Sequence, residues 1–275
     1  MALQTIAFQG ERGAFSEEAA YQLLGSRIRA LPCESFAGVF ASVARGKSRM
    51  CLVPIENTLA GSVYENYDLL VSNRLHIIGE VNLRIVHNLI GFGETSRKNL
   101  RRVYSHPVAL AQCSRFFEKH PAIEKVPFYD TAGSVKMLAE RRLPGAAAIA
   151  SRAAARVYKA RILATHLEDH HENYTRFLLL SKSASVSSQA NKVSIVFSTR
   201  NVPGALFKCL GVFALRDIDL TKMESRPLRG RPWEYLFYVD FKGSTREERC
   251  QKALAHLGEI TNFIRVLGCY PSAKR

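Results

Sequence analysis

Polar side chains stand where an apolar, strand-like run of this sequence ends. Glu56, Asn57 and Thr58 follow the run that begins at Met50, and Gly61 precedes the next expected helix. An acid, an amide and a hydroxyl in one short stretch can bind and orient a polar ligand. The same residue types also cap ordinary loops, and the spacing alone leaves these two interpretations even.

A second group of polar residues comes at Ser105 and His106, directly before Pro107, which suits the first turn of a helix. Gln112 follows about two turns along that helix, close enough to the end of the strand at Ser105 to contact a ligand bound there. Ser105 beside His106 is not a catalytic triad, and the sequence contains no Gly-x-Ser-x-Gly motif. His106 could relay a proton or could be purely structural.

Thr175, Arg176 and Phe177 enter the last strand expected in the first part of the chain. The guanidinium of Arg176 could pair bidentately with a carboxylate, and Thr175 offers a hydroxyl beside it. The acidic and histidine-rich stretch over residues 166–172 could hold a metal, but such a run is usually a solvated loop. We therefore expect no metal there.

The stretch near the N-terminus could bind an anion. Gly10 and Gly13 allow a close turn, and Ser16 could cap the following helix while its free N–H groups face the ligand. An ordinary turn and helix cap would use the same residues, so this motif is weak by itself.

Alternating strands and helices position these residues. We expect strands at residues 5–9, 28–32, 50–55, 102–104, 126–129, 146–150 and 175–180, with a β-rich stretch over 76–92. We expect helices at residues 16–24, 36–45, 63–71, 108–119, 132–141 and 152–158. This alternation is typical of βαβ units in mainly parallel sheets, which bind ligands at the carboxyl ends of their strands.

A serine-rich stretch divides the chain. It predicts a first domain over residues 1–181, a linker over 182–191 and a second domain over 192–275. In the second domain we expect strands at 192–198, 219–224, 233–241 and 263–270, and helices at 204–216 and 245–257. This order is the β-α-β-β-α-β arrangement of a split βαβ fold.

Composition and charge limit the classes of protein. The 275 residues, 47% of them hydrophobic, predict a globular chain, and no apolar run approaches the ~20 residues of a membrane span. Without a signal peptide, we expect a soluble, cytoplasmic protein. The 6 cysteines are scattered and predict neither a metal site nor a disulfide framework. The net charge of +15 comes without a nucleic-acid-binding motif and favours a multi-anionic metabolite as ligand.

In their order along the chain, these motifs resemble those of prephenate dehydratases. The matching motifs are Gly10–Ser16 (G-x-x-G-x-F-S), Pro54–Thr58 (P-I-E-N-T), Ser105–Pro107 (S-H-P), Asp130–Ala132 (D-T-A) and Thr175–Phe177 (T-R-F). The second domain resembles an ACT regulatory domain through Gly204-Ala205-Leu206 and the E-S-R-P motif at Glu224–Pro227. Each motif is weak alone, but their ordered occurrence over nearly the whole chain is specific.

The resemblance implies an α/β fold, with two catalytic lobes similar to periplasmic binding proteins followed by a ferredoxin-like (βαββαβ) ACT domain. It implies decarboxylative dehydration of prephenate to phenylpyruvate in phenylalanine biosynthesis, without a cofactor. It also implies feedback by phenylalanine and a homodimer or homotetramer. We further expect neither a fused mutase segment nor a plastid leader on this chain.

The resemblance assigns catalytic roles to Asn57, Ser105, Gln112 and Thr175, and we add Glu56 beside Asn57 as a catalytic candidate. Our own candidates for substrate binding are Arg176, Phe177, Ser16, Thr58, His106 and Thr131. Phenylalanine binding falls on Gly204, Ala205, Leu206, Glu224, Ser225, Arg226 and Pro227.

The chain departs from the family pattern at two places, and other functions stay open. Val108 stands where a glutamine is usual, and Tyr158-Lys159-Ala160 replaces the common Y-G-L, which makes the substrate preference less secure. Arogenate is therefore an alternative substrate. A ligand-binding sensor without catalysis is an alternative of another class, because two-lobed domains and ACT domains both serve as binding modules.

Overall fold

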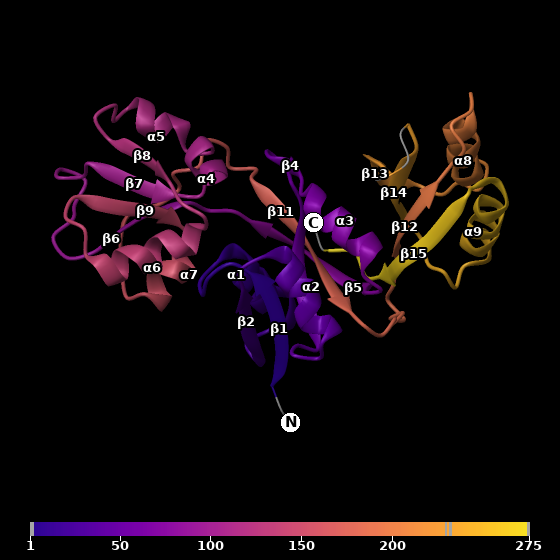
Figure 1. Ribbon diagram of the computed structural model, residues 1–275, viewed down its shortest axis with the longest axis horizontal. Coiled ribbons are helices and arrows are strands. Elements are labelled where there is room, and N and C mark those ends of the chain that lie inside the picture. The colour runs from indigo at the N-terminus through magenta and orange to yellow at the C-terminus, as the bar shows by residue number, and fades with distance from the viewer. Residues whose placement is uncertain (1–2, 229, 231–232, 274–275) are drawn as a thin grey trace. The chain divides into compact units, whose positions relative to one another are not determined.

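The computed structural model describes residues 3–228, 230 and 233–273, which form two compact units (Figure 1). Unit 1 contains the residues up to Leu69 together with Val81–Leu178, and unit 2 contains Leu70–Glu80 and the residues from Leu179 onward. Segment 70–80 belongs to unit 2 because the guanidinium of Arg265 donates to four of its carbonyl groups. The structure thus groups with unit 2 a segment that the sequence placed in the first domain.

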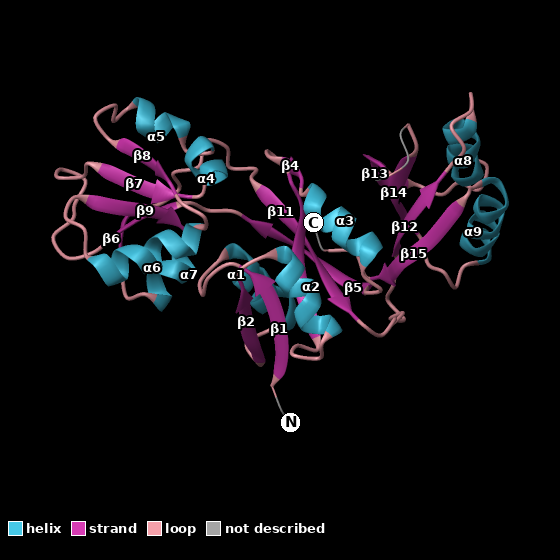
Figure 2. Ribbon diagram, in the orientation of Figure 1, coloured by secondary structure: helices cyan, strands magenta, loops and turns pink. Residues whose placement is uncertain are grey.

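The first sheet of unit 1 carries parallel strands, with helices between them (Figure 2). Its elements are β1 (Gln4–Gln9), α1 (Phe15–Leu24), β2 (Ile28–Cys33), α2 (Phe36–Ala44), β3 (Met50–Asn57) and β4 (Gly61–Ser62). Three more elements, α3 (Tyr64–Ser72), β5 (His76–Arg84) and β11 (Tyr174–Ser181), are each divided between the two units. The strand order runs β11-β3-β1-β2, and β1 is parallel to both neighbours. The short β4, which the sequence did not predict, pairs with the end of β3.

The second sheet of unit 1 is mixed rather than mainly parallel. Its elements are β6 (Asn88–Gly91), β7 (Arg102–Ser105), α4 (Pro107–Ala111), α5 (Ser114–Glu118), β8 (Glu124–Pro127), α6 (Thr131–Arg141), β9 (Ala146–Ala150), α7 (Arg152–Val157) and β10 (Arg161–Ala164). β7 is parallel to β8 and β9, whereas β6 is antiparallel to β9 and β10. The alanine-rich β9 is fully buried, and α6 packs on it through Ala132, Val135 and Leu138.

The single helix predicted over residues 108–119 is wrong, because α4 and α5 are separate. The carboxylate of Asp169 accepts hydrogen bonds from Ser114 N at 2.8 Å and Arg115 N at 3.0 Å, which starts a new helix at Ser114. Gln112 consequently lies at the end of α4 instead of in the middle of a long helix, and its carbonyl accepts from Asp169 N at 2.8 Å. The break depends on a residue far along the chain.

The predicted cap at Ser16 is also wrong. Helix α1 begins at Phe15 with Ala14 at its N-cap, so Ser16 lies inside the first turn. The buried carboxylate of Glu17 accepts a short hydrogen bond of 2.5 Å from Gly13 N, in the turn before the helix. Glu17 therefore connects the first turn of α1 to the turn that leads into it, and no side chain caps the helix at Ala14.

Unit 2 has the predicted β-α-β-β-α-β order. Its elements are β12 (Lys192–Ser198), α8 (Ala205–Ala214), β13 (Leu220–Pro227), β14 (Tyr235–Lys242), α9 (Glu248–Ile260) and β15 (Phe263–Tyr270). The sheet order is β13-β14-β12-β15, all antiparallel. Alternate residues of β12 (Val193, Ile195 and Phe197) share a core with buried side chains of α8 and α9. Among the described residues, no helix is long and apolar enough to cross a membrane.

Candidate active site

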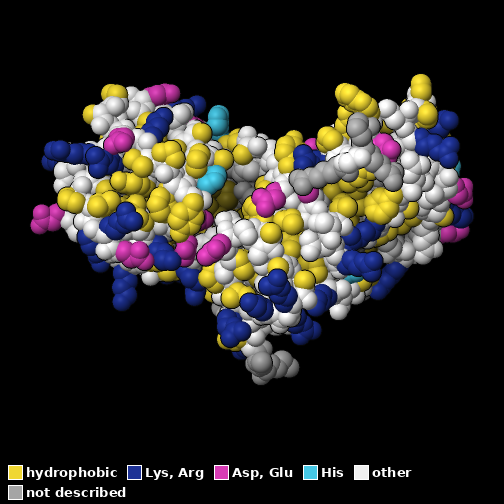
Figure 3. All heavy atoms as spheres, viewed as in Figure 1, with side chains coloured by type: hydrophobic (Ala, Val, Ile, Leu, Met, Phe, Trp, Pro, Cys, Tyr) yellow, Lys and Arg dark blue, Asp and Glu magenta, His cyan; other side chains and the backbone are white. Residues whose placement is uncertain are grey.

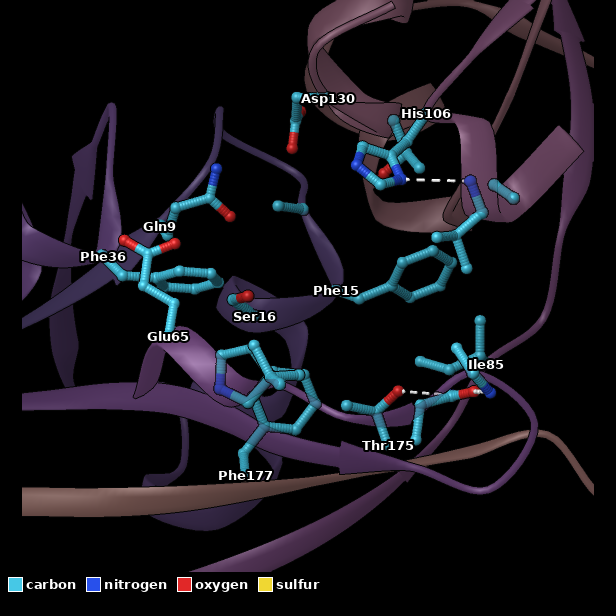
Figure 4. A pocket seen from close by; sticks show the side chains of 18 of the residues that line it. Gln9, Phe15, Ser16, Phe36, Glu65, Ile85, His106, Asp130, Thr175 and Phe177 are labelled. Atoms are coloured by element: carbon cyan, nitrogen blue, oxygen red, sulfur yellow. Dashed lines mark hydrogen bonds between the residues drawn. The ribbon is translucent and has the colours of Figure 1, made fainter. Parts of the chain in front are cut away.

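A cavity of about 610 Å³ lies within unit 1, where β1, β2, β3, β7 and β8 end. Phe15, Phe36 and Phe177 supply aromatic rings to its wall, and polar groups lie around them (Figure 4). The carboxyl ends of parallel strands from both sheets meet here, which is where α/β folds bind ligands.

Asn57, at the end of β3, is held in one orientation by its own turn. Its Oδ1 accepts hydrogen bonds from Leu59 N at 3.0 Å and Ala60 N at 2.8 Å. Its Nδ2 therefore faces β11, where it donates to Asn173 Oδ1 at 2.7 Å and to Thr175 Oγ1 at 2.9 Å. Because Thr175 Oγ1 accepts this bond, the hydroxyl hydrogen of Thr175 is left to donate into the cavity.

Gln112 joins this network from the second sheet. Its Nε2 donates to Asn57 Oδ1 at 3.3 Å, and its Oε1 accepts from Asn173 Nδ2 at 3.0 Å and lies 2.9 Å from His87 Nε2. The structure thus brings Asn57, Gln112 and Thr175 together, as the motifs suggested. The sequence reasoning missed His87, which stands in the β-rich stretch 76–92, and the available signal was the polar His87-Asn88 step inside an apolar run.

The lining of the cavity is acidic. It includes Glu34, Glu65 and Asp130, and among the described residues no Lys or Arg lines it. Burial raises the pKa of Asp130. Burial also lowers the pKa of His106, against the opposing effect of the Asp130 carboxylate. The site therefore offers amide and hydroxyl donors and negatively charged side chains, but no permanent cation.

The predicted substrate-site residues divide into two sets. Those that line the cavity are Ser16, Asn57, His106, Gln112, Thr131, Thr175 and Phe177. Those that do not line it are Glu56, Thr58, Ser105 and Arg176. Each residue of the second set is a sequence neighbour of a residue that lines the cavity, but its own side chain is not part of the lining.

Ser105 and Thr58 connect the elements that surround the cavity. Ser105 is fully buried, and its Oγ donates to the carbonyl of Ile149 on β9 at 2.6 Å. Thr58 Oγ1 donates to the carbonyl of Glu172 at 2.8 Å and accepts from Tyr174 N at 3.0 Å, which attaches the β3 turn to β11. In this structure both hydroxyls position the site and neither points into it.

The positions of Arg176 and Glu56 are set by the strands that carry them. Arg176 stands between Thr175 and Phe177 on β11, and successive side chains of a strand point to opposite faces. Its half-buried side chain therefore leaves β11 on the face away from the cavity. Glu56 stands opposite Ser62 in the β3–β4 pair.

His166, Glu168 and His171 form a cluster in which one ligand atom from each lies within 4.8 Å of the others. Other groups already engage them: Glu168 Oε2 accepts from His87 N at 2.9 Å, and a guanidinium nitrogen of Arg84 lies 3.5 Å from His171 Nδ1. A neighbouring guanidinium opposes the binding of a cation. These residues therefore form a hydrogen-bonded loop, and they offer a poor metal site.

Unit 2 holds the predicted phenylalanine-binding residues on two separate elements. Gly204 adopts φ 77° at the N-cap of α8, and Ala205 and Leu206 after it line a cavity of about 110 Å³. Glu224–Pro227 belongs to β13, and no residue of this strand lines that cavity. β13 therefore continues past the strand expected at residues 219–224 and includes residues 225–227.

Figure 3 shows Lys and Arg side chains scattered over the visible face instead of gathered in one patch. The fold and the cavity together define an α/β protein that has a polar-lined cavity in unit 1 and a second, βαββαβ unit.

Comparison with known proteins identifies the family. Residues 6–185 match the family model described as prephenate dehydratase. The chain is 46% identical to "Arogenate dehydratase/prephenate dehydratase 2, chloroplastic" of Arabidopsis thaliana over 97% of this chain and 72% of that protein. The chain therefore belongs to the prephenate dehydratase family, and it is an enzyme of the carbon–oxygen lyase class.

Two solved structures align with nearly the whole chain, and one of them is described as a prephenate dehydratase. A prephenate dehydratase from Arthrobacter aurescens in complex with L-Phe aligns with a TM-score of 0.89 at 31% identity, covering 97% of this chain and 89% of that one. A protein described as GqqA, a quorum-quenching acylase, aligns with a TM-score of 0.90 at 33% identity, covering 98% of both chains.

Proposed function

We propose that unit 1 converts prephenate to phenylpyruvate in the cavity, with the hydroxyl of Thr175 as donor to the departing oxygen. The orientation of Thr175 carries this proposal. Asn57 Nδ2 donates to Thr175 Oγ1 at 2.9 Å, which leaves the threonine hydrogen free to stabilise developing charge on a leaving hydroxyl.

The reaction requires stabilisation of charge more than a strong base. The bond from the ring to its carboxylate breaks, and its electron pair enters the ring. The bond to the ring hydroxyl then breaks, and a proton from solvent completes a water molecule. The products are phenylpyruvate, carbon dioxide and water, and the ring becomes aromatic. A hydrogen bond to the departing oxygen, and apolar walls around the departing carboxylate, both favour this transition state.

The acidic lining favours a second substrate. Arogenate carries an ammonium group where prephenate carries a ketone, and Glu34, Glu65 or Asp130 could receive an ammonium. Both compounds carry two carboxylates, and no Lys or Arg is among the described lining residues, so the ammonium is the group through which an acidic lining distinguishes them. We therefore propose arogenate as an alternative substrate of the same site.

Turnover of both substrates tests these assignments and the sensor alternative. We expect the purified chain to convert prephenate or arogenate at equal concentrations with release of carbon dioxide. Calorimetric binding of either compound without turnover would instead make the chain a sensor. If the chain shows no binding and no turnover of either compound, the proposed function is refuted.

We further propose that unit 2 is an ACT domain through which phenylalanine inhibits the enzyme. The β-α-β-β-α-β order and the G-A-L and E-S-R-P motifs support this, as does the L-Phe complex of the Arthrobacter relative. Because the two motifs lie on separate elements, and Glu224–Pro227 does not line the cavity of about 110 Å³ beside Ala205 and Leu206, we propose that they bind phenylalanine between paired copies, in a homodimer or homotetramer. Domain limits at 181 and 192 and a cytoplasmic location remain predictions.

A further inference from the structure

His87 is a buried group of the cavity wall for which the chemistry above assigns no role. It lies between β5 and β6, and its side chain is nearly inaccessible to solvent. Its backbone N–H donates to Glu168 Oε2 at 2.9 Å, and its carbonyl accepts from Leu167 N at 3.0 Å. Its ring packs edge-on against Phe15, with the ring centroids 5.6 Å apart. Backbone and ring are therefore both held in one position.

The hydrogen-bond network determines which nitrogen of His87 carries the hydrogen. Asn57 Oδ1 accepts from Leu59 N and Ala60 N, which fixes this atom as the oxygen of the amide. Gln112 must therefore present its Nε2 to Asn57 Oδ1. Gln112 Oε1 then faces His87, and His87 Nε2 must be the donor of the 2.9 Å bond. In the neutral ring Nδ1 then carries no hydrogen. This agrees with the surroundings of Nδ1, which is buried without a hydrogen-bond partner in the described part of the chain.

Burial keeps this ring neutral. Desolvation lowers the pKa of His87, although the bond to Gln112 and the charge of Glu168 act in the opposite direction. A neutral Nε2–H donor is thus present over the physiological pH range. His87 is therefore suited to hold a neighbouring group in place.

We propose that His87 is a positioning residue, whose Nε2–H holds the carboxamide of Gln112 so that a hydrogen of its Nε2 points at the substrate. Gln112 Nε2 uses one hydrogen on Asn57 Oδ1 and keeps the second for a ligand oxygen. Gln112 Oε1 accepts from both His87 and Asn173, and two donors on the carbonyl strengthen the N–H groups of the same amide as donors. The inference deepens the proposed function and depends on it.

Variants that keep or remove the donor test the proposal. His87→Phe keeps a planar ring but leaves Gln112 Oε1 with Asn173 alone, and we expect kcat to fall on the order of 10–100-fold with a smaller change in KM. His87→Gln returns an amide donor near the position of Nε2, and we expect it to recover most of the lost kcat. His76→Phe, outside the cavity, is the matched control and should leave kcat within about twofold of the starting value.

A double-mutant cycle separates positioning from packing. If His87 acts through Gln112, His87→Phe should change kcat by less than about twofold in a Gln112→Ala background. An equal loss in both backgrounds, or equal losses in His87→Phe and His87→Gln at matched melting temperatures, would overturn the proposal.

The tautomer gives a readout that does not depend on activity. Nitrogen-15 spectra of histidine-labelled protein should show the Nε2–H form of His87, and an Nδ1–H form would refute the inference even if the enzyme is active. Absence of turnover of prephenate and arogenate by the unsubstituted chain would instead refute the proposed function, so the two failures are distinguishable.

Discussion

The two units bring their predicted site residues together to different extents. In unit 1, Asn57, Gln112 and Thr175 come from distant parts of the chain and meet in one hydrogen-bond network. In unit 2, the motifs Gly204–Leu206 and Glu224–Pro227 stay on separate elements, and β14 lies between β13 and β12. Parallel strands carry their carboxyl ends to a common edge, whereas an antiparallel sheet spreads its motifs over both ends. A site in unit 1 can be complete within one chain, whereas for unit 2 we propose a site between two copies.

The largest expected effect is the loss of the donor in unit 1. Thr175→Ala removes a hydrogen bond needed mainly in the transition state, and we expect kcat to fall on the order of 10²–10³-fold with little change in KM. Thr175→Ser keeps the hydroxyl and is the matched control, which should retain most of the activity. Steady-state kinetics decide the matter, and wild-type turnover by Thr175→Ala would remove this residue from the mechanism.

The corresponding change in unit 2 should act on regulation only. Gly204 has a left-handed φ of 77° and open space around its α-carbon, so Gly204→Val strains the backbone without a clash. We expect turnover without phenylalanine to persist, and the midpoint of inhibition by phenylalanine to rise on the order of tenfold. Gly211→Ala, in α8 with open space and no positive φ, is the control and should respond normally. An unchanged midpoint in Gly204→Val would place the regulatory site elsewhere.

A smaller effect should distinguish the two substrates of unit 1. Glu65 lies on the cavity wall, exposed to solvent, so its attraction for an ammonium group is partly screened. Glu65→Gln should lower the ratio of kcat/KM for arogenate to that for prephenate by about fivefold. Glu259→Gln, on an exposed position of α9, should leave the ratio unchanged. If both variants keep the ratio, the ammonium is recognised by another group.

The smallest effect concerns stability and pH in unit 1. Burial raises the pKa of Asp130 in the folded state, so the folded protein holds this proton more tightly than the unfolded chain does. The contribution of Asp130 to stability is therefore present at low pH. It is lost as the pH rises from the ordinary carboxyl value near ~3.9 through the raised folded value. Asp130→Asn should remove this change, which we expect to be under about 1 kcal/mol, as measured by urea unfolding across that range. A pH dependence identical in both proteins would contradict the assignment.

Sequence patterns predicted the order of elements in both units, because hydrophobic periodicity and capping residues act locally. They failed where a distant residue decides the local structure. Asp169, far along the chain, divides the expected helix 108–119 into α4 and α5. The start of α1 is a local error, because this helix begins at Phe15 and Ser16 lies inside its first turn. The short strands β4 and β10 were missed because pairing with β3 and β6 defines them.

The motifs by themselves predicted several of the polar residues that line the cavity, since side chains that end parallel strands gather at one edge of a sheet. Only the tertiary structure decided which of them face the cavity. The alternation of β11 turns Arg176 away from Thr175, and packing against β9 buries the hydroxyl of Ser105. Only the tertiary structure showed that His87 belongs to the cavity wall and its hydrogen-bond network. The direction of a hydrogen bond depends on partners that lie far apart along the chain and meet only in the folded protein.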